Sequence, residues 1–218
     1  MTGASGLLGA AMAVELAGRG AAVLLIGRDR ATIDETARSV HEGPTIAGLR
    51  CDLASAEDID AAADFVRAVG RPVDLLVHAT GLSDPSTIGA APVELLDEHY
   101  LLNLRGPYQL TQRLLPLLSA PRGRVVFFTA AGQAAPDDAH HSMTDAALRS
   151  MADTLRVELA TSGRRVLTVA THAGRDLPDP GYLASLARTI VDSVIEEHVD
   201  VTDLLAGPGP RRGRTEQR

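Results

Sequence analysis

The chain opens on a glycine-spaced turn, Met1 to Gly9, in which glycine recurs at every third residue: Gly3, Gly6 and Gly9. A helix follows at once and is expected to end near residues 18–20. Glycines at this spacing let the backbone turn tightly and approach a pyrophosphate, and the helix N-terminus offers N–H donors and a positive dipole to an anion. The turn favours a nucleotide-binding α/β fold. An alanine- and glycine-rich helix start would give the same spacing by chance, so the motif alone is a weak signal.

The segment after this helix strengthens the interpretation. Residues 21–27 are a short apolar run bounded by turn residues, as expected of a buried parallel strand, and Arg28 follows directly. The order of a Thr-Gly-x-x-Gly-x-x-Gly turn, a helix, an apolar strand and Gly27-Arg28-Asp29 resembles the start of the short-chain dehydrogenase/reductase family. The resemblance extends from Thr2 to about Leu205. It implies a Rossmann-type doubly wound parallel sheet with helices on both faces.

The start of the chain departs from that family. Family members have an apolar central strand before the glycine turn, whereas here Met1 stands where the last residue of that strand would be. Either the start codon is misassigned or the chain is truncated, and the sequence leaves both open. Unless another segment fills the place, we expect an empty slot beside strand 21–27, with unpaired backbone groups that cost about 1–3 kcal/mol each.

The rest of the chain alternates helices and strands. Helices are expected over residues 30–42, 55–69, 92–118, 140–162 and 182–197, and strands over residues 45–51, 73–78, 124–128, 165–170 and 199–205. Pro107 and Pro116 are expected to kink the helix 92–118 rather than end it, because apolar periodicity continues through both. A single domain is expected over residues 1–207, followed by a disordered Pro/Gly/Arg tail at 208–218.

Composition excludes several classes of function. A net charge of −7 and an aromatic content of 3% argue against a nucleic-acid surface. No apolar run reaches membrane-spanning length. The single cysteine, Cys51, excludes an internal disulfide and suggests a reducing compartment, so we expect a cytoplasmic protein. All 21 basic residues are arginines, so any mechanism that needs a lysine is excluded.

The resemblance implies a catalytic site, but the residues that family members use there are absent. In the family, a serine after the strand corresponding to 124–128 polarises the substrate carbonyl. A tyrosine on the next helix transfers the proton, and a lysine four residues later lowers the pKa of that tyrosine and holds the nicotinamide ribose. The matching positions here are Thr129, His141 and Asp145, and Asn103 matches a helix asparagine that holds a catalytic water.

His141 and Asp145 are four residues apart on one helix, so we expect them to interact. A histidine is a competent acid or base near neutral pH. We therefore predict that His141 performs proton transfer, with Thr129 polarising the substrate and Asp145 accepting hydrogen bonds from ribose hydroxyls. The alternative is that this site has lost its chemistry and that the pair is a helix-surface contact.

The resemblance also implies a cofactor site. Its candidate residues come from the glycine turn, the ends of the neighbouring strands and one late loop: Gly3, Ser5, Gly6, Leu7, Gly9, Arg28, Asp52, Leu53, Ala79, Gly81 and Gly174. Arg28 favours NADP(H) over NAD(H), because a guanidinium can meet a 2′-phosphate where NAD users commonly place a carboxylate. Asp29 beside it weakens this argument, and Asp52 is as well explained as the start of a turn.

Four histidines follow strand ends, towards the edge where such sheets bind ligands: His78, His140, His141 and His172. They lack the spacing of metal ligands, so no metal site is predicted.

Three hypotheses for function remain. The first is an NADP(H)-dependent oxidoreductase that acts on a carbonyl or hydroxyl group of a small molecule through altered catalytic residues. The second is a dehydratase, isomerase or cyclase that uses His141 for proton transfer. The third is a non-catalytic protein that keeps the fold for association. The resemblance implies a homodimer or homotetramer formed through the helices 92–118 and 140–162.

Overall fold

The computed structural model describes residues 1–39, 46–130, 137–171 and 180–195. Within these residues the strands are β1 (Val23–Gly27), β2 (Ile46–Arg50), β3 (Leu75–His78), β4 (Arg124–Ala130) and β5 (Arg165–Thr171). β1 pairs with β2, and β3, β4 and β5 form a second ladder in that order. Every pairing is parallel. The parallel sheet expected from the sequence is confirmed.

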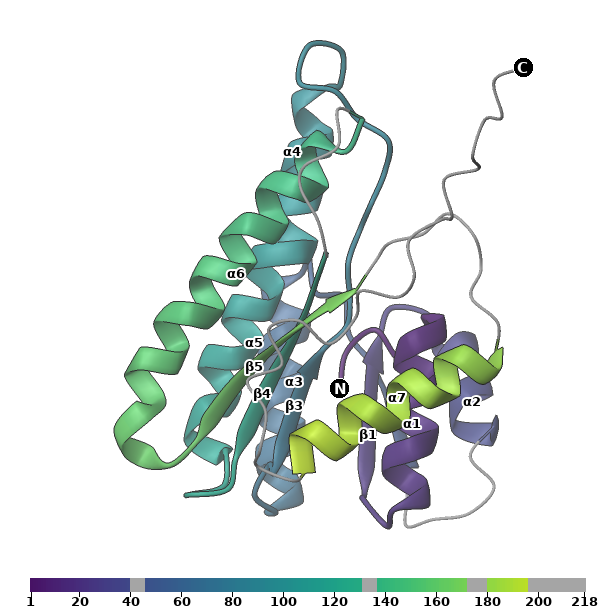
Figure 1. The fold of residues 1–218 in the computed structure, drawn as a ribbon, viewed down its shortest axis with the longest axis vertical. Coiled ribbons are helices and arrows are strands. Elements are labelled where there is room, and N and C mark those ends of the chain that lie inside the picture. The colour runs from purple at the N-terminus through teal and green to yellow at the C-terminus, as the bar shows by residue number, and fades with distance from the viewer. Residues whose placement is uncertain (40–45, 131–136, 172–179, 196–218) are drawn as a thin grey trace, which may run out of the picture.

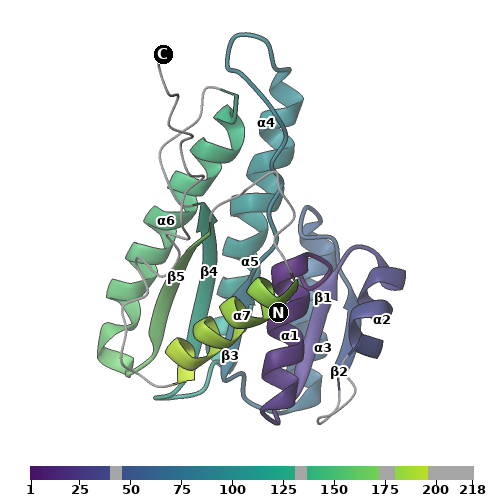
Figure 2. The same ribbon diagram turned by 45° about the vertical axis from the view of Figure 1, so that its right-hand side comes forward.

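The helices alternate with these strands along the chain. They are α1 (Leu7–Gly18), α2 (Arg30–Ser39), α3 (Ala56–Val69), α4 (Val93–Tyr100), α5 (Gly106–Leu114), α6 (Ala139–Leu159) and α7 (Pro180–Ile195). α1 and α7 pack together on one face of the sheet, and α3, α5 and α6 cover the other (Figures 1 and 2). Each face buries its own apolar core, one built around Met12 and Ile190 and the other around Phe127 and Leu110. This is the doubly wound arrangement.

The long helical stretch expected over residues 92–118 is divided. After α4 comes a π-helical turn, η1 (Leu101–Arg105), then α5, and then a 3-10 turn, η2 (Leu115–Leu117). Pro107 lies in the first turn of α5 and lacks the N–H that an α-helix would use there, so the preceding turn widens while the helix continues. Pro116 lies in the closing 3-10 turn. The prediction that Pro116 kinks the helix without ending it is therefore wrong.

Met1 and Thr2 join the two ladders. Thr2 forms parallel bridges to both Ile26 of β1 and His78 of β3. The N–H of Thr2 donates to the carbonyl of Val77 (2.9 Å), and the N–H of Ile26 donates to the carbonyl of Met1 (2.8 Å). Because Thr2 forms a bridge to β1 on one side and to β3 on the other, the gap between these two strands is one strand wide.

Beside Met1 this gap continues as a cavity of about 610 Å³. Its walls are the facing edges of β1 and β3 and apolar side chains that include Phe65 and Leu114. The amine of Met1 lies 2.6 Å from the carbonyl of Leu24, and burial lowers its pKa to about 5. In a parallel strand, each residue points its N–H and C=O to the same side, and successive residues alternate between the two sides. The N–H and C=O groups of Leu24 and Leu75 therefore point into the cavity. Within the described residues, only Met1 and Thr2 pair with the facing edges of β1 and β3.

Several expected features lie outside the described residues: the strand 199–205, the tail 208–218, His172 and Gly174. No helix within the described ranges is both long enough and apolar enough to span a bilayer.

Candidate active site and cofactor site

The glycine turn is held against the end of β3. Gly3 has φ +70°, and a Cβ on it would lie 2.2 Å from the carbonyl oxygen of Ala79. A Cβ on Gly9 would lie 2.2 Å from the carbonyl oxygen of Gly3. Glycine is therefore required at both positions, and Ala79 is placed by backbone contact with the turn. The packing leaves Ser5, Gly6 and Leu7 exposed at the start of α1.

The N-terminus of α1 has free donors. Gly6 is the N-cap, no side chain caps the helix, and the first turn carries no acidic residue. Its leading N–H groups therefore find no side-chain acceptor among the described residues, and the helix dipole adds positive potential at the same place. These features fit the phosphates of a dinucleotide.

Arg28 and Asp29 follow β1, and their side chains have different roles. The carboxylate of Asp29 accepts hydrogen bonds from the Ala31 N–H (2.8 Å) and the Thr32 hydroxyl (2.9 Å), and so caps α2. The hydrogen bond from the Thr32 hydroxyl is the main cause that lowers the pKa of Asp29. Arg28 is exposed and makes no ion pair with a described residue. The Asp29 carboxylate therefore caps α2, which removes the argument that it competes with a 2′-phosphate for Arg28.

The remaining cofactor candidates differ in exposure. Asp52 is half-buried, and its carboxylate accepts the N–H of Ala54 (3.0 Å), as the turn interpretation predicts. Leu53 is buried in the core, and a Cβ on Gly106 would lie 2.4 Å from its carbonyl oxygen. Leu53 therefore packs against α5 with its side chain inside the core. Gly81 is exposed after β3.

Asn103 lies in the π turn η1 and is buried. Its side-chain oxygen accepts the N–H of Leu82 (2.7 Å), and its side-chain nitrogen donates to the Leu82 carbonyl (2.9 Å) and the Thr144 hydroxyl (3.1 Å). The amide therefore fastens the loop after β3 to α6. A water held by Asn103 would have to use the main-chain carbonyl, and π turns disrupt the regular carbonyl pairing of a helix.

A pair of buried histidines adjoins this network. The ring of His99, in α4, meets the ring of His140 edge-on, with centroids 5.7 Å apart. His99 Nδ1 lies 3.4 Å from the side-chain nitrogen of Asn103, whereas His99 Nε2 and His140 Nδ1 are buried without a partner among the described residues. Burial is the main cause that lowers the pKa of His99.

Asp145, at the position of the family's lysine, is buried and holds the end of β4. Its Oδ1 accepts the N–H of Ala130 (2.7 Å), and its Oδ2 forms an ion pair with Arg149 Nη2 (2.7 Å) that is not aligned as a hydrogen bond. Arg149 also donates to the carbonyl of Ala130 (3.3 Å). Both carboxylate oxygens thus have partners within the chain, which leaves little capacity for a ribose. Thr129, one residue before Ala130, is buried.

His141 pairs with Asp138, three residues earlier in the chain. Its Nδ1 lies 3.0 Å from Oδ2 of Asp138, and its side chain is 15% exposed. No hydrogen bond or ion pair joins His141 to Asp145 within the described residues. The expected contact between His141 and Asp145 is therefore not formed: His141 contacts Asp138, and Asp145 contacts Ala130 and Arg149. The spacing Asp138-x-x-His141 at a helix start is the signal that could have revealed this pair.

His78 belongs to the core of the protein. It is 2% exposed, its Nε2 lies 2.8 Å from the Thr111 hydroxyl, and its ring stacks on Phe127 with centroids 4.9 Å apart. Burial, aided by the nearby Met1 amine, lowers its pKa to about 3, so the ring is neutral at pH 7. No group of three or more potential metal ligands is found among the residues that the structure describes.

A doubly wound parallel sheet whose glycine turn leads into an uncapped helix N-terminus defines a dinucleotide-binding α/β protein. The sequence profile described as short chain dehydrogenase matches residues 1–174. The chain belongs to the short-chain dehydrogenase/reductase family.

Relatives of known sequence or structure agree with this assignment. An uncharacterized short-chain type dehydrogenase/reductase of Sinorhizobium fredii is 31% identical over 236 residues, covering 95% of this chain and 90% of the relative. A metagenomic short-chain oxidoreductase solved in complex with NADP is 26% identical, with a TM-score of 0.79 and coverage of 91% and 90%. L-Sorbose reductase from Gluconobacter frateurii, complexed with NADPH and L-sorbose, is also 26% identical, with a TM-score of 0.73 and coverage of 78% and 66%.

Proposed function

We propose that this family member is an NADP(H)-binding oxidoreductase that acts on a carbonyl or hydroxyl group of a small molecule. The observation that carries the proposal is the uncapped N-terminus of α1 together with an exposed Arg28 whose acidic neighbour caps α2. The similar proteins solved with NADP or NADPH support the same choice of cofactor. When bound, NADP(H) supplies or accepts the hydride.

The proton in this reaction is assigned to His141. Of the three positions that hold Ser, Tyr and Lys in the family, it is the one that carries an imidazole here, a side chain that can both donate and accept a proton; the other two are Thr129 and Asp145. Its Nδ1 is paired with Asp138, and no hydrogen bond to its Nε2 is found among the described residues, so Nε2 is the atom that can exchange a proton with a substrate oxygen. Thr129 supplies a hydroxyl at the end of β4.

The cofactor is tested by calorimetric titration of the 218-residue protein with NADPH and with NADH. We expect tighter binding of NADPH, and no heat from either nucleotide would remove the proposal. Activity is tested by following NADPH oxidation with L-sorbose, cyclohexanone and an aromatic aldehyde. His141→Gln should then lower the turnover of any accepted substrate, with the affinity for NADPH unchanged.

A non-catalytic role is the second candidate, and the commitment of Asp145 to Ala130 and Arg149 favours it. Nucleotide binding without turnover of any carbonyl or alcohol would support this role. A dehydratase, isomerase or cyclase that uses His141 would instead exchange solvent deuterium into a bound ligand without NADPH oxidation.

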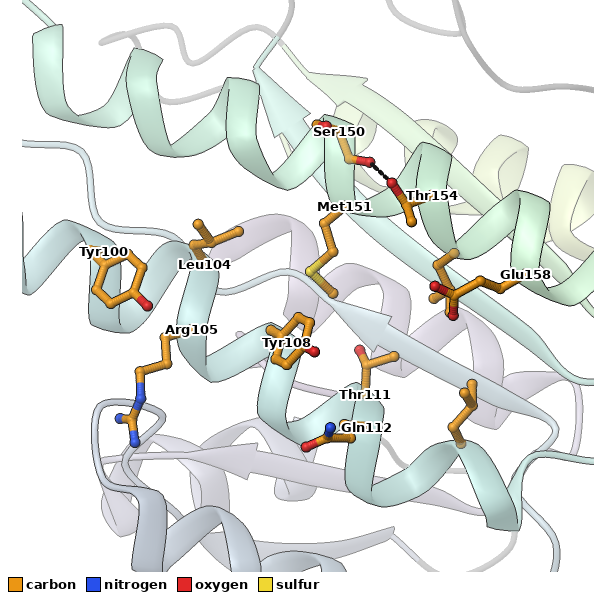
Figure 3. A pocket seen from close by; sticks show the side chains of 12 residues that line it. Tyr100, Leu104, Arg105, Tyr108, Thr111, Gln112, Ser150, Met151, Thr154 and Glu158 are labelled. Carbon is orange, nitrogen blue, oxygen red and sulfur yellow. Dashed lines mark hydrogen bonds between the residues drawn. The ribbon is translucent and has the colours of Figure 1, made fainter.

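Self-association is also proposed. A groove of about 530 Å³ runs along the outer side of η1, α5 and α6 (Figure 3). Tyr100 and Tyr108 form one wall, and Met151 and Thr154 face them from α6. Both tyrosines are about half exposed, at 47% and 54%, and aromatic side chains are enriched at protein interfaces. A homodimer or homotetramer formed through these helices would cover them. The cytoplasmic location stays a prediction.

A further inference from the structure

The N-cap position of α6 is held by an acidic residue whose side chain does not cap the helix. Asp138 is the N-cap residue of α6, and no side chain makes a cap hydrogen bond there. An aspartate in this position ordinarily accepts the N–H of the second or third helical residue. Its Oδ2 lies instead 3.0 Å from His141 Nδ1, in the same turn. The Asp138 carboxylate therefore contacts the imidazole ring of His141 and not the backbone of α6.

The backbone around Asp138 is fastened to the loop after β3. Ser86 is 5% exposed and forms a parallel bridge to Asp138. The N–H of Ser86 donates to the carbonyl of Asp137 (2.8 Å), and the N–H of Ala139 donates to the carbonyl of Ser86 (3.0 Å). The Ser86 hydroxyl accepts the N–H of His140 (3.3 Å). Ser86 thus makes hydrogen bonds to the residue before Asp138 and to the two residues after it. These bonds fix the backbone position from which the Asp138 carboxylate extends.

The arrangement sets the proton positions on His141. A carboxylate accepts only, so the nitrogen that faces it must carry hydrogen. Nδ1 is then the N–H nitrogen of the neutral ring, and the lone pair is on Nε2. This is the tautomer in which the unpaired nitrogen can act as a base, or as an acid once protonated.

We propose that Asp138 is a positioning residue that fixes the tautomer and ring orientation of His141 for proton transfer through Nε2. This inference rests on the proposed function. In the reduction of a carbonyl, bound NADPH would supply the hydride to the carbon as the carbon–oxygen π bond breaks. His141, protonated beforehand on both ring nitrogens, would give its Nε2 proton to the oxygen. The neutral ring keeps its Nδ1 proton towards Asp138, which stays ionised, and solvent returns a proton to Nε2.

Asp145 cannot take this task, because its oxygens serve Ala130 and Arg149. The two aspartates therefore have different tasks: Asp145 stabilises the end of β4, and Asp138 orients the group that exchanges the proton.

The test reads the histidine tautomers directly by nitrogen-15 NMR of the full chain, with His141→Gln used to assign the His141 signals. At neutral pH we expect the Nδ1–H tautomer of His141, and its replacement by the Nε2–H tautomer in Asp138→Asn. Asp153→Asn is the matched control, because Asp153 also pairs with a residue three positions on in α6, Arg156, and is 69% exposed. It should leave the His141 signals unchanged.

Turnover gives a second reading. Asp138→Asn should lower kcat about 100-fold or more, because a misoriented ring loses the contribution of a positioned general acid, with KM and NADPH affinity little changed. An Nε2–H tautomer in the unsubstituted protein, or an unchanged tautomer in Asp138→Asn, overturns the positioning role whatever the activity. If the tautomer changes as expected but His141→Gln retains full turnover, the assignment of the proton to His141 fails, and Asp138 loses its part in the reaction.

Discussion

The carboxylate of Asp145 lies 2.7 Å from the guanidinium of Arg149, one turn later in α6, and the two side chains hold Ala130 by its N–H and its carbonyl. In Asp145→Ala the N–H of Ala130 and the guanidinium both lose a partner at a half-buried strand end. We expect a loss of about 2–3 kcal/mol in the free energy of unfolding, measured with urea.

Asp153→Ala provides the comparison, because the exposed pair of Asp153 with Arg156 should contribute about 0.5 kcal/mol or less. Equal losses in the two variants would show that the contact with Ala130 adds nothing beyond a surface ion pair.

The slot between β1 and β3 should accept a strand if residues are added before Met1. Extending the chain before Met1 by Val-Ala-Leu-Val should place a strand in the 610 Å³ cavity, pair the backbone groups of Leu24 and Leu75, and replace a buried amine with a peptide N–H. Several new hydrogen bonds and the buried apolar area should add at least about 3 kcal/mol to the free energy of unfolding. A Gly-Ser-Gly-Ser extension of the same length is the control. If the two extensions give the same unfolding midpoint in urea, the slot does not accept a strand.

The buried ring of His78 makes stability depend on pH. Its pKa is about 3 in the folded protein and near 6.5 in the unfolded chain, so between these values the unfolded state binds the extra proton. The free energy of unfolding should therefore fall on acidification from pH 6.5 to pH 3, by up to about 1.4 kcal/mol per pH unit from this group. His78→Phe removes the titrating ring and should flatten the profile relative to the unsubstituted protein. Parallel profiles from urea titrations at each pH would contradict the burial of a neutral ring.

The sequence predicted the parallel sheet and the glycine turn, because each depends on local pattern: apolar runs bounded by turn residues, and glycines at fixed spacing. It also located the helix that carries His141. It did not predict the partners of His141 and Asp145, because side chains three or four residues apart on a helix are equally near, and tertiary contacts with Ala130 and Ser86 decide between them. The pattern likewise could not reveal that Leu53 turns into the core against Gly106.

Arg28 makes a prediction about cofactor choice. In Arg28→Ala the affinity for NADPH should fall about 10- to 100-fold, the range for a charge-assisted hydrogen bond, while the affinity for NADH should change little. Arg67→Ala, which removes an exposed arginine from α3, controls for the loss of charge. Calorimetric titration with both nucleotides measures the effect, and an equal loss for NADPH and NADH would exclude a contact with the 2′-phosphate.

Tyr108 tests the association face. It is 54% exposed on α5 and lines the groove opposite Met151 and Thr154 of α6 (Figure 3). If copies of the chain associate through this face, Tyr108→Arg places a charge in an apolar contact and should shift the protein towards monomer at micromolar concentration in sedimentation velocity. Ile88→Arg is the control, because Ile88 is 77% exposed and lies in the loop after β3, outside the groove. An unsubstituted protein that sediments as a monomer, or a Tyr108→Arg variant that keeps the larger mass, would exclude this face as the interface.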